Sequence, residues 1–348
     1  MKYLTHRDSD RAVLAAFIFI ALHLCLAINA LAAAAPTKQV VGYATHTARV
    51  LPLWLAGEQK LFLKNGIDID PVFIRGAPTL VAGLAGGSIH LGRTGGAATL
   101  AAVSAGHDFK IIATFSSRNT YDLVVRPHIK RAEDIRGKTF AVTSIGGTSW
   151  MGVLLWLEHL GLDQQRDNIR FQVIGDQAVQ VQCVENGLCD AAAVDGVFTK
   201  QLKQKGMTVL GEYTDLKAPL VSQAVVVPGP LLQQRPEIAE NYLKGELEAL
   251  AFSLAPKNKP VVIKSLMRHL KVDSSSAEDA YVDLIRGVDR KPFASLDGLR
   301  NVQRLLKMRN PKIGEVKAED VVDNRIMRKL DESGFIERAY AAHGASLK

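Results

Sequence analysis

Cysteine and aromatic side chains are scarce in this sequence, whose 348 residues include three Cys, three Trp and 6% aromatic residues. Cysteines this few do not form a zinc cage. Cys183 and Cys189 lie close together in the sequence, and in an oxidising compartment they can pair if their Cα atoms lie about 4.4–6.8 Å apart. We predict this disulfide, with a modest stabilising effect because the loop is short.

The sequence also lacks the common catalytic motifs. His-Glu-x-x-His and Gly-x-Ser-x-Gly are absent, and Gly137-Lys138-Thr139 is no P-loop because Ala132 stands where the first glycine belongs. We therefore expect no enzyme activity, no cofactor and no metal.

Clusters of basic residues are missing as well. The chain carries 43 Lys and Arg against 35 Asp and Glu, a net charge of +8, but the basic residues are scattered and no basic stripe with interleaved aromatic residues occurs. We expect no nucleic-acid partner. The positive balance is compatible with an anionic surface or an anionic ligand.

The sequence has one long apolar run, residues 12–28, and no second run long enough to span a membrane. Lys2, Arg7 and Arg11 precede it, and small residues follow it up to residue 35, a pattern typical of a secretory signal. We expect residues 1–35 to be a signal peptide, the mature chain to begin between Ala33 and Pro36 with a net charge of +7, and the protein to be periplasmic and soluble. An uncleaved anchor is the alternative, because 17 apolar residues lie near the lower limit for crossing a bilayer.

Strand and helix patterns alternate along the rest of the chain, which predicts an α/β protein with largely parallel sheets. The expected strands are 39–43, 67–74, 89–92, 109–115, 138–142, 171–174 and 190–194. The expected helices are 51–58, one from Pro78, 97–105 capped by Thr94, 150–160 and 178–186. More than 310 mature residues suggest two domains.

The strand and helix pattern restarts after Pro127, so a second α/β lobe is nested inside the first. We assign residues 36–125 and 225–348 to lobe I and residues 126–224 to lobe II. The runs 122–125 and 223–227 flank lobe II and are the expected crossing strands. The chain after Pro228 is expected to be helical.

Four segments resemble the binding proteins of importers for aliphatic sulfonates, taurine and nitrate, and the related thiamine-pyrimidine precursor binders. They are Pro52-Leu-Trp-Leu-Ala-Gly-Glu58 with residues 61–69, residues 80–92 ending in Gly-Gly-Ser-Ile-His-Leu-Gly, Glu133-Asp-Ile-Arg-Gly-Lys138, and Glu185-Asn-Gly-Leu-Cys-Asp-Ala191. Residues 334–340 resemble the closing helix of the family. His90 departs from the usual Asp, and Arg93-Thr-Gly-Gly96 replaces a variable loop, so the ligand cannot be copied from one relative.

The resemblance implies a type II periplasmic-binding-protein fold, with two lobes that close on a ligand about a two-strand hinge. It also implies a small-molecule ligand, and an inner-membrane permease with its ATPase as partner of an ABC import system. We expect the receptor to be a monomer. A sulfonate is the example ligand that we expect, although the sequence does not identify the solute.

Ligands of open α/β sheets bind beyond the carboxyl ends of strands, where loops lead into helix N-termini that suit anions. The predicted ligand-binding residues in such loops are Thr45, His46, Arg93, Thr94, Gly95, Gly96, Ser116, Ser117, Arg118, Gly147, Thr148, Ser149, Gln177 and Asp195. Arg93 and Arg118 would pair with an oxyanion, and the segments 93–96 and 147–149 would hold the ligand from either lobe. Plainer roles stay open: helix capping for Thr148 or Ser149, solvation for the arginines, and a hinge contact for His46 or Asp195.

Three other functions remain open at this stage. One is an enzyme related to thiamine-pyrimidine synthesis, although the cysteine-rich motif of that synthase is missing. Another is a ligand-sensing domain of a transcription regulator, for which a helix-turn-helix would replace the export signal. The last is a receptor that senses its solute without transport.

Overall fold

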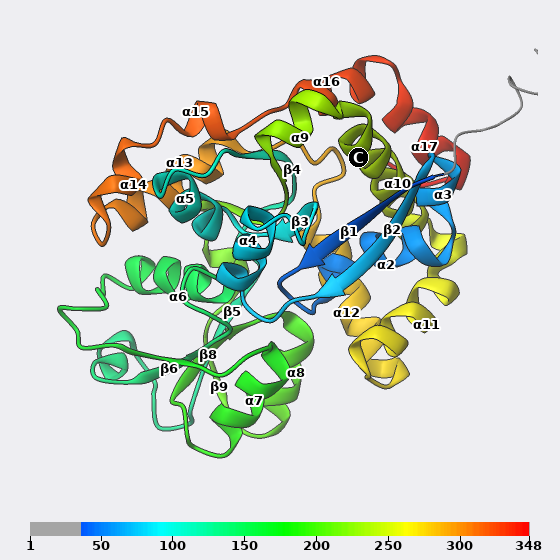
Figure 1. Cartoon of the computed structure of the whole chain (residues 1–348). Coiled ribbons are helices and arrows are strands. Elements are labelled where there is room, and N and C mark those ends of the chain that lie inside the picture. The colour runs from blue at the N-terminus through cyan, green and yellow to red at the C-terminus, as the bar shows by residue number, and fades with distance from the viewer. Residues whose placement is uncertain (1–35, 348) are drawn as a thin grey trace, which may run out of the picture. The chain divides into compact units, whose positions relative to one another are not determined.

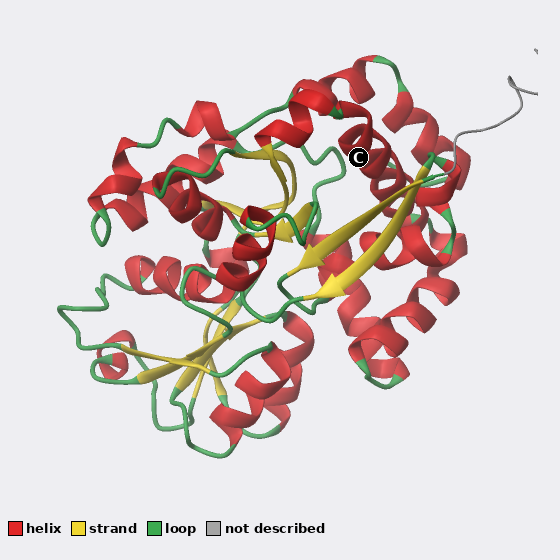
Figure 2. Ribbon diagram, viewed as in Figure 1, coloured by secondary structure: helices red, strands yellow, loops and turns green. Residues whose placement is uncertain are grey.

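Two five-stranded sheets, each flanked by helices, organise the computed structural model (Figures 1 and 2). The model describes residues 36–347, so the predicted signal peptide and its cleavage site lie outside the described residues. The first sheet has the order β2-β1-β3-β10-β4. Its strands are β1 (Thr37–Tyr43), β2 (Ile67–Phe73), β3 (Leu91–Thr94), β4 (Phe109–Arg118) and β10 (Pro219–Pro228).

The second sheet has the order β7-β6-β8-β5-β9. Its strands are β5 (Asp122–Val125), β6 (Thr139–Val142), β7 (Arg170–Val173), β8 (Ala191–Val194) and β9 (Thr208–Gly211). In each sheet four strands run in the same direction, and one strand runs antiparallel to its two neighbours: β10 in the first sheet and β5 in the second. The sequence expectation of an α/β fold with largely parallel sheets agrees with this topology.

Helices connect the strands and form the C-terminal part of the chain. Those among the strands are η1 (Ala48–Val50), α2 (Leu51–Glu58), α3 (Leu61–Lys64), α4 (Ala77–Ala85), α5 (Gly96–Ser104), η2 (Ala132–Ile135), α6 (Thr148–His159), α7 (Gln177–Glu185), α8 (Gly196–Gln204) and η3 (Tyr213–Asp215). After β10 follow α9 (Gly229–Gln234), α10 (Pro236–Leu254), η4 (Pro256–Asn258), α11 (Lys259–Leu270), α12 (Ser274–Gly287), α13 (Leu296–Lys307), α14 (Pro311–Glu315), α15 (Ala318–Val321), α16 (Arg325–Glu332) and α17 (Phe335–His343). Within residues 36–347, no helix is both long and apolar enough to cross a membrane.

Local sequence signals explain the element boundaries. Helix α2 has a proline in its first turn, where the missing N–H costs no hydrogen bond, and Gly66 ends the following helical segment with a positive φ of 77°. Strands β5 and β8 are buried along their whole length and contain only short apolar residues apart from Asp122. This pattern is typical of strands covered on both faces.

The chain crosses between the sheets at positions slightly different from those expected. Residues 122–125 were assigned to lobe I, but β5 pairs with β8 and β9 in the second sheet. Residues 219–224, assigned to lobe II, belong to β10 in the first sheet. The crossings therefore lie between β4 and β5 and between β9 and β10. We call the part built on the first sheet lobe I and the part built on the second sheet lobe II.

Cys183 and Cys189 form a disulfide, with Cα atoms 5.2 Å apart, inside the range set out above. The bridge joins the last turn of α7 to the segment before β8. Both side chains are buried in a small apolar cluster with Val181, Val184 and Val194.

Candidate functional site

The candidate site lies between the lobes, where loops at the carboxyl ends of strands meet. Ala44 to Thr47 follow β1, Phe73 ends β2, and Thr143 follows β6. Together with Tyr121, Ser149, Asp176 and Gln177, these residues line a cavity of about 10 Å³. This volume holds about one water molecule, so an organic solute enters only if the lobes move apart.

Two helices begin at this cavity. Helix α6 starts after Gly147, and α7 starts after Asp176, whose carboxylate accepts a hydrogen bond from the N–H of Val179. The first N–H groups of a helix lack intrahelical partners, and the helix dipole adds partial positive charge there. The cavity is therefore suited to a group that accepts hydrogen bonds.

Thr148 of lobe II contacts both the hinge and lobe I. Its hydroxyl lies 3.1 Å from that of Tyr121, which follows β4 at the crossing between the lobes. A Cβ atom on Gly95 of lobe I would lie 2.8 Å from the Thr148 methyl group. Since Gly95 leaves room for this contact, the two segments predicted to face each other do touch.

Arg49 lies next to this cavity and connects the lobes. Its guanidinium donates to Asp195, which precedes α8 in lobe II, and to the Thr120 hydroxyl, and it lies 4.9 Å from the centre of the Tyr121 ring. Gln177 holds Asp195 from the other side, donating to its carboxylate at 2.7 Å and accepting from its N–H at 2.7 Å. Asp195 and Gln177 are thus parts of a contact between the lobes.

Asp283 extends this contact from α12. Its carboxylate accepts a hydrogen bond of 2.9 Å from the N–H of Val197, in the first turn of α8. Lys200 of α8 donates to Asp279 of α12 at 2.7 Å. Burial and the nearby Asp195 carboxylate raise the pKa of Asp283 to about 7.

Several buried polar atoms around the lobe junction have no hydrogen-bond partner within residues 36–347. They are Thr47 Oγ1, Thr94 Oγ1, Ser116 Oγ, Asn119 Oδ1, Ser222 Oγ, Gln223 Oε1, and Nε and Nη2 of Arg49. Buried polar groups normally have a partner, because leaving one unpaired costs about 1–3 kcal/mol. The described residues leave these atoms unpaired, so water or a polar solute is the partner left for them; Thr47 of this set also lines the cavity.

The prediction that Arg93 faces the ligand is not supported. Arg93 is 1% exposed, its guanidinium donates to Glu246 of α10 at 2.9 Å, and it lies 4.1 Å from the centre of the Phe115 ring. Burial raises the pKa of Glu246, and the Arg93 charge opposes that rise. Because its charge is already paired inside lobe I, Arg93 has a structural role.

The neighbours of Arg93 have different roles. Thr94 ends β3 and does not cap α5, since Gly95 is the N-cap residue and no side chain caps it. Gly96 packs closely on lobe I, since an added Cβ would lie 2.9 Å from Val221 and 3.0 Å from Leu299. Of the segment 93–96, Thr94 offers an unpartnered hydroxyl and Gly95 offers the contact with lobe II.

Three predicted ligand-binding residues, Ser116, Ser117 and Arg118, lie at the end of β4. Ser116 is buried and its hydroxyl is unpartnered. The N–H of Ser117 donates to Asp289, and Arg118 is exposed and donates to the Arg286 carbonyl. Neither Ser117 nor Arg118 lines the cavity, and the predicted oxyanion contact of Arg118 stays a prediction.

Thr45 and His46, two of the predicted ligand-binding residues, line the cavity, and both are held by lobe I. Thr45 accepts from Gln223 at 2.7 Å, and His46 Nε2 lies 2.6 Å from the carbonyl oxygen of His269. The His46 ring lies among aromatic rings, 5.2 Å from Phe73 and 5.1 Å from Trp54. Trp54 is buried and belongs to the apolar core of lobe I.

Ser149 also lines the cavity, and its hydroxyl accepts from the N–H of Thr143 and donates to the Thr143 hydroxyl. These bonds tie the first turn of α6 to the end of β6. Gly147 is the N-cap residue of α6. Neither Thr148 nor Ser149 therefore acts as the cap that the sequence allowed.

Sequence reasoning missed Tyr121, Thr143, Asp176 and Arg49. Thr143 directly follows an expected strand and Asp176 lies in an expected strand-end loop, so their positions carried a usable signal. No sequence signal pointed to Tyr121 or Arg49, because their roles depend on contacts with the other lobe. Within residues 36–347, no group of three or more His, Cys, Asp or Glu is arranged to hold a metal ion.

Comparison with solved structures supports the fold. The alkanesulfonate-binding protein SsuA from Xanthomonas axonopodis pv. citri, solved bound to MOPS, matches with a TM-score of 0.68 and 19% identity, over 84% of this chain and 99% of that one. The aliphatic sulphonate binding protein SsuA from Escherichia coli matches with a TM-score of 0.67 and 21% identity, over 83% and 92% of the two chains. The nitrate-binding protein NrtA from Synechocystis PCC 6803 gives a TM-score of 0.65 and 15% identity, over 85% and 89%. These similarities confirm the expected periplasmic-binding-protein-like fold.

A search of curated proteins found no match. A family model does match residues 48–232, more than half of the chain; the match covers the loop after β6 that lines the cavity and begins just after the lining residues 44–47. Its members are described as periplasmic substrate-binding proteins of phosphonate ABC transporters. This chain belongs to that family, the periplasmic substrate-binding proteins of ABC transporters.

Proposed function

We propose that this protein binds a small organic anion, such as a sulfonate, between its two lobes and delivers it to the permease and ATPase of an ABC importer. Substrate-binding proteins of such importers are not enzymes, and the family is periplasmic. The chemical class of the solute and the monomeric state of the protein are parts of this proposal.

The observation that carries the proposal is the set of buried, unpartnered polar atoms at the lobe junction. It contains four hydroxyls of lobe I, those of Thr47, Thr94, Ser116 and Ser222, and two N–H-bearing nitrogens of Arg49. An oxyanion accepts several hydrogen bonds at once, and guanidinium and helix N-terminal N–H groups are donors suited to it. The structurally similar proteins include binding proteins for sulfonates and for nitrate, which supports the same ligand chemistry.

A thermal-shift screen with sulfonates, phosphonates, nitrate and carboxylates identifies the ligand, because a solute that binds only the folded protein raises its melting temperature. Calorimetry on Thr94→Val then tests the site. The variant loses one hydroxyl but keeps its shape, so we expect affinity to fall about fivefold, the equivalent of about 1 kcal/mol for one hydrogen bond.

The unliganded Thr94→Val protein should be as stable as the wild type or more stable, because the buried hydroxyl has no partner to lose. Thr208→Val, on β9 away from the junction, is the matched control and should keep full affinity. Unchanged affinity in Thr94→Val would move the solute away from this junction. A screen in which no anion shifts the melting temperature would reject the proposed ligand class.

A further inference from the structure

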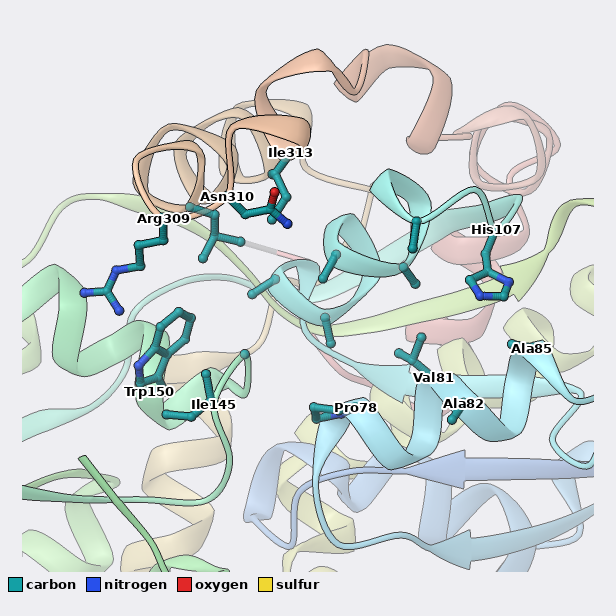
Figure 3. Close-up of a pocket in the computed structure, with 17 residues that line it drawn as sticks. Pro78, Val81, Ala82, Ala85, His107, Ile145, Trp150, Arg309, Asn310 and Ile313 are labelled. Carbon is teal, nitrogen blue, oxygen red and sulfur yellow. The ribbon is translucent and has the colours of Figure 1, made fainter. Parts of the chain in front are cut away.

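A second cavity lies outside the lobe-junction site. It is a groove of about 490 Å³ between α4, α5 and the segment that joins α13 to α14, and lobe II contributes Ile145, Gly146 and Trp150 to its lining. Figure 3 shows the groove from the side of Ile145 and Trp150 to that of His107. The two cavities lie against the same loop of lobe II, since Thr143 and Ser149 line the junction cavity whereas Ile145 and Gly146 line the groove. The groove volume falls within the range of about 300–1,000 Å³ found for small-molecule sites.

The walls of the groove are apolar. Helices α4 and α5 contribute mainly alanines, which leave space because their side chains are short, and Val81 and Ile313 add larger apolar surface. Pro78, Val81 and Ala82 lie along one side of the groove and Ile313 along another (Figure 3). Such walls suit an extended hydrocarbon chain or an aromatic body.

The two ends of the groove differ. Trp150 and Arg309 lie at one end, where the guanidinium carbon is 5.3 Å from the centre of the indole, and His107 lies at the other end (Figure 3). The Arg309 side chain forms no ion pair or hydrogen bond with the described residues. The indole N–H of Trp150, a residue that is 3% exposed, also has no acceptor among residues 36–347.

The charge at the Arg309 end is not neutralised locally. None of the described residues that line the groove is acidic. Burial lowers the pKa of the guanidinium, and Asp163 opposes that shift from beyond the groove. A positive charge on an aromatic face, next to an apolar groove, complements a molecule with an anionic head and an apolar body.

We propose that this groove is a second binding site, which takes an amphipathic organic anion with its head group at Arg309 and its apolar part along α4 and α5. The proposal is independent of the solute at the lobe junction. Alkylsulfonates and alkylcarboxylates share the required chemistry, and octanesulfonate is the probe that tests it.

Calorimetry of octanesulfonate on the mature protein is the first measurement. Ala101→Leu fills the groove from an exposed position on α5, and Arg309→Gln removes the charge. We expect each to weaken octanesulfonate binding by roughly tenfold or more. Octanol, which has the chain without the charge, and methanesulfonate, which has the charge without the chain, should both bind more weakly at this groove.

The matched controls are Ala341→Leu on α17 and Arg328→Gln on α16, an exposed alanine and an exposed arginine away from the groove. Both should bind octanesulfonate like the wild type. No binding to the folded wild type, or equal binding by both groove variants, would overturn the proposal. Loss of octanesulfonate binding in Thr94→Val alone would also overturn the proposal, because octanesulfonate would then occupy the lobe junction. If the thermal-shift screen finds no solute for the lobe junction, the results expected for octanesulfonate at the groove stay the same.

Discussion

Arg93 illustrates at the residue scale how an interaction distant in sequence determines a role. Its position after a strand, in a glycine-rich loop, favoured an oxyanion contact. Glu246, 153 residues later, pairs with it inside lobe I, and the hydroxyl of Tyr242 donates to the same carboxylate. Local sequence patterns report the end of a strand, but they do not report which charge the folded chain brings to it.

Replacing Arg93 by Met should therefore affect folding. It leaves a buried carboxylate without its cation, and we expect the free energy of unfolding to fall by about 3–5 kcal/mol. Urea denaturation measures this change. The double variant Arg93→Met, Glu246→Gln should recover part of the loss, because the unpaired charge is removed as well.

Arg118→Met is the control, since Arg118 is exposed, and its stability should stay close to that of the wild type. If Arg93→Met instead kept its stability and lost affinity for the junction solute, Arg93 would be a ligand contact as the sequence suggested.

At the element scale, local signals located most strands and helices. Helix α2 has the bounds expected from its proline and its apolar spacing, and β2 differs from the expected strand by one residue. The lobe to which each crossing strand belongs was predicted less accurately. Strands β5 and β10 are both apolar, and their sheet membership depends on pairing with distant strands. Thr45, His46, Ser149 and Gln177 line the junction cavity, and their position there could be predicted because each lies in a loop or helix start that follows a readable strand end.

The contact of α8 with α12 joins elements of different lobes, and we expect it to depend on pH. Asp283 has a pKa of about 7 in the folded protein, above the ordinary value of about 3.9 in an unfolded chain. Folding therefore favours the protonated form. Stability from this group is fully present below the unfolded pKa and is lost as the pH rises through about 7. The charged groups that act on it are Asp195, Arg49 and Asp122.

Asp283→Asn should remove this pH dependence while keeping an oxygen that accepts from Val197. We expect the variant to melt above the wild type at about pH 8, where wild-type Asp283 is ionised, and the difference to shrink towards about pH 5. Melting curves of both proteins over this range measure it. Asp279→Asn, on the same helix, is the control for the loss of an acidic residue from α12. A constant difference between Asp283→Asn and the wild type at all pH values would show that Asp283 does not titrate in this range.

At the scale of the whole molecule, the lobes touch across the site. Arg49 with Asp195, Asp283 with Val197, and Glu158 of α6 with Arg304 of α13 are contacts between the lobes. With the lobes in contact the junction cavity measures only about 10 Å³. A ligand that contacts both lobes would favour this closed arrangement, and its entry requires an open one. Sequence patterns indicated two lobes but not these contacts, which depend on side chains far apart in the chain.

The most direct test of this account is a disulfide that locks the lobes together. Gly95 and Thr148 touch across the junction, so oxidised Gly95→Cys, Thr148→Cys should hold the lobes closed. Titration of the junction solute into the oxidised and the reduced variant is the measurement, with wild type under the same reductant as control for the native disulfide. The account predicts binding by the reduced variant and none by the oxidised, unliganded one. Equal binding by both, with the cross-link intact, would contradict it.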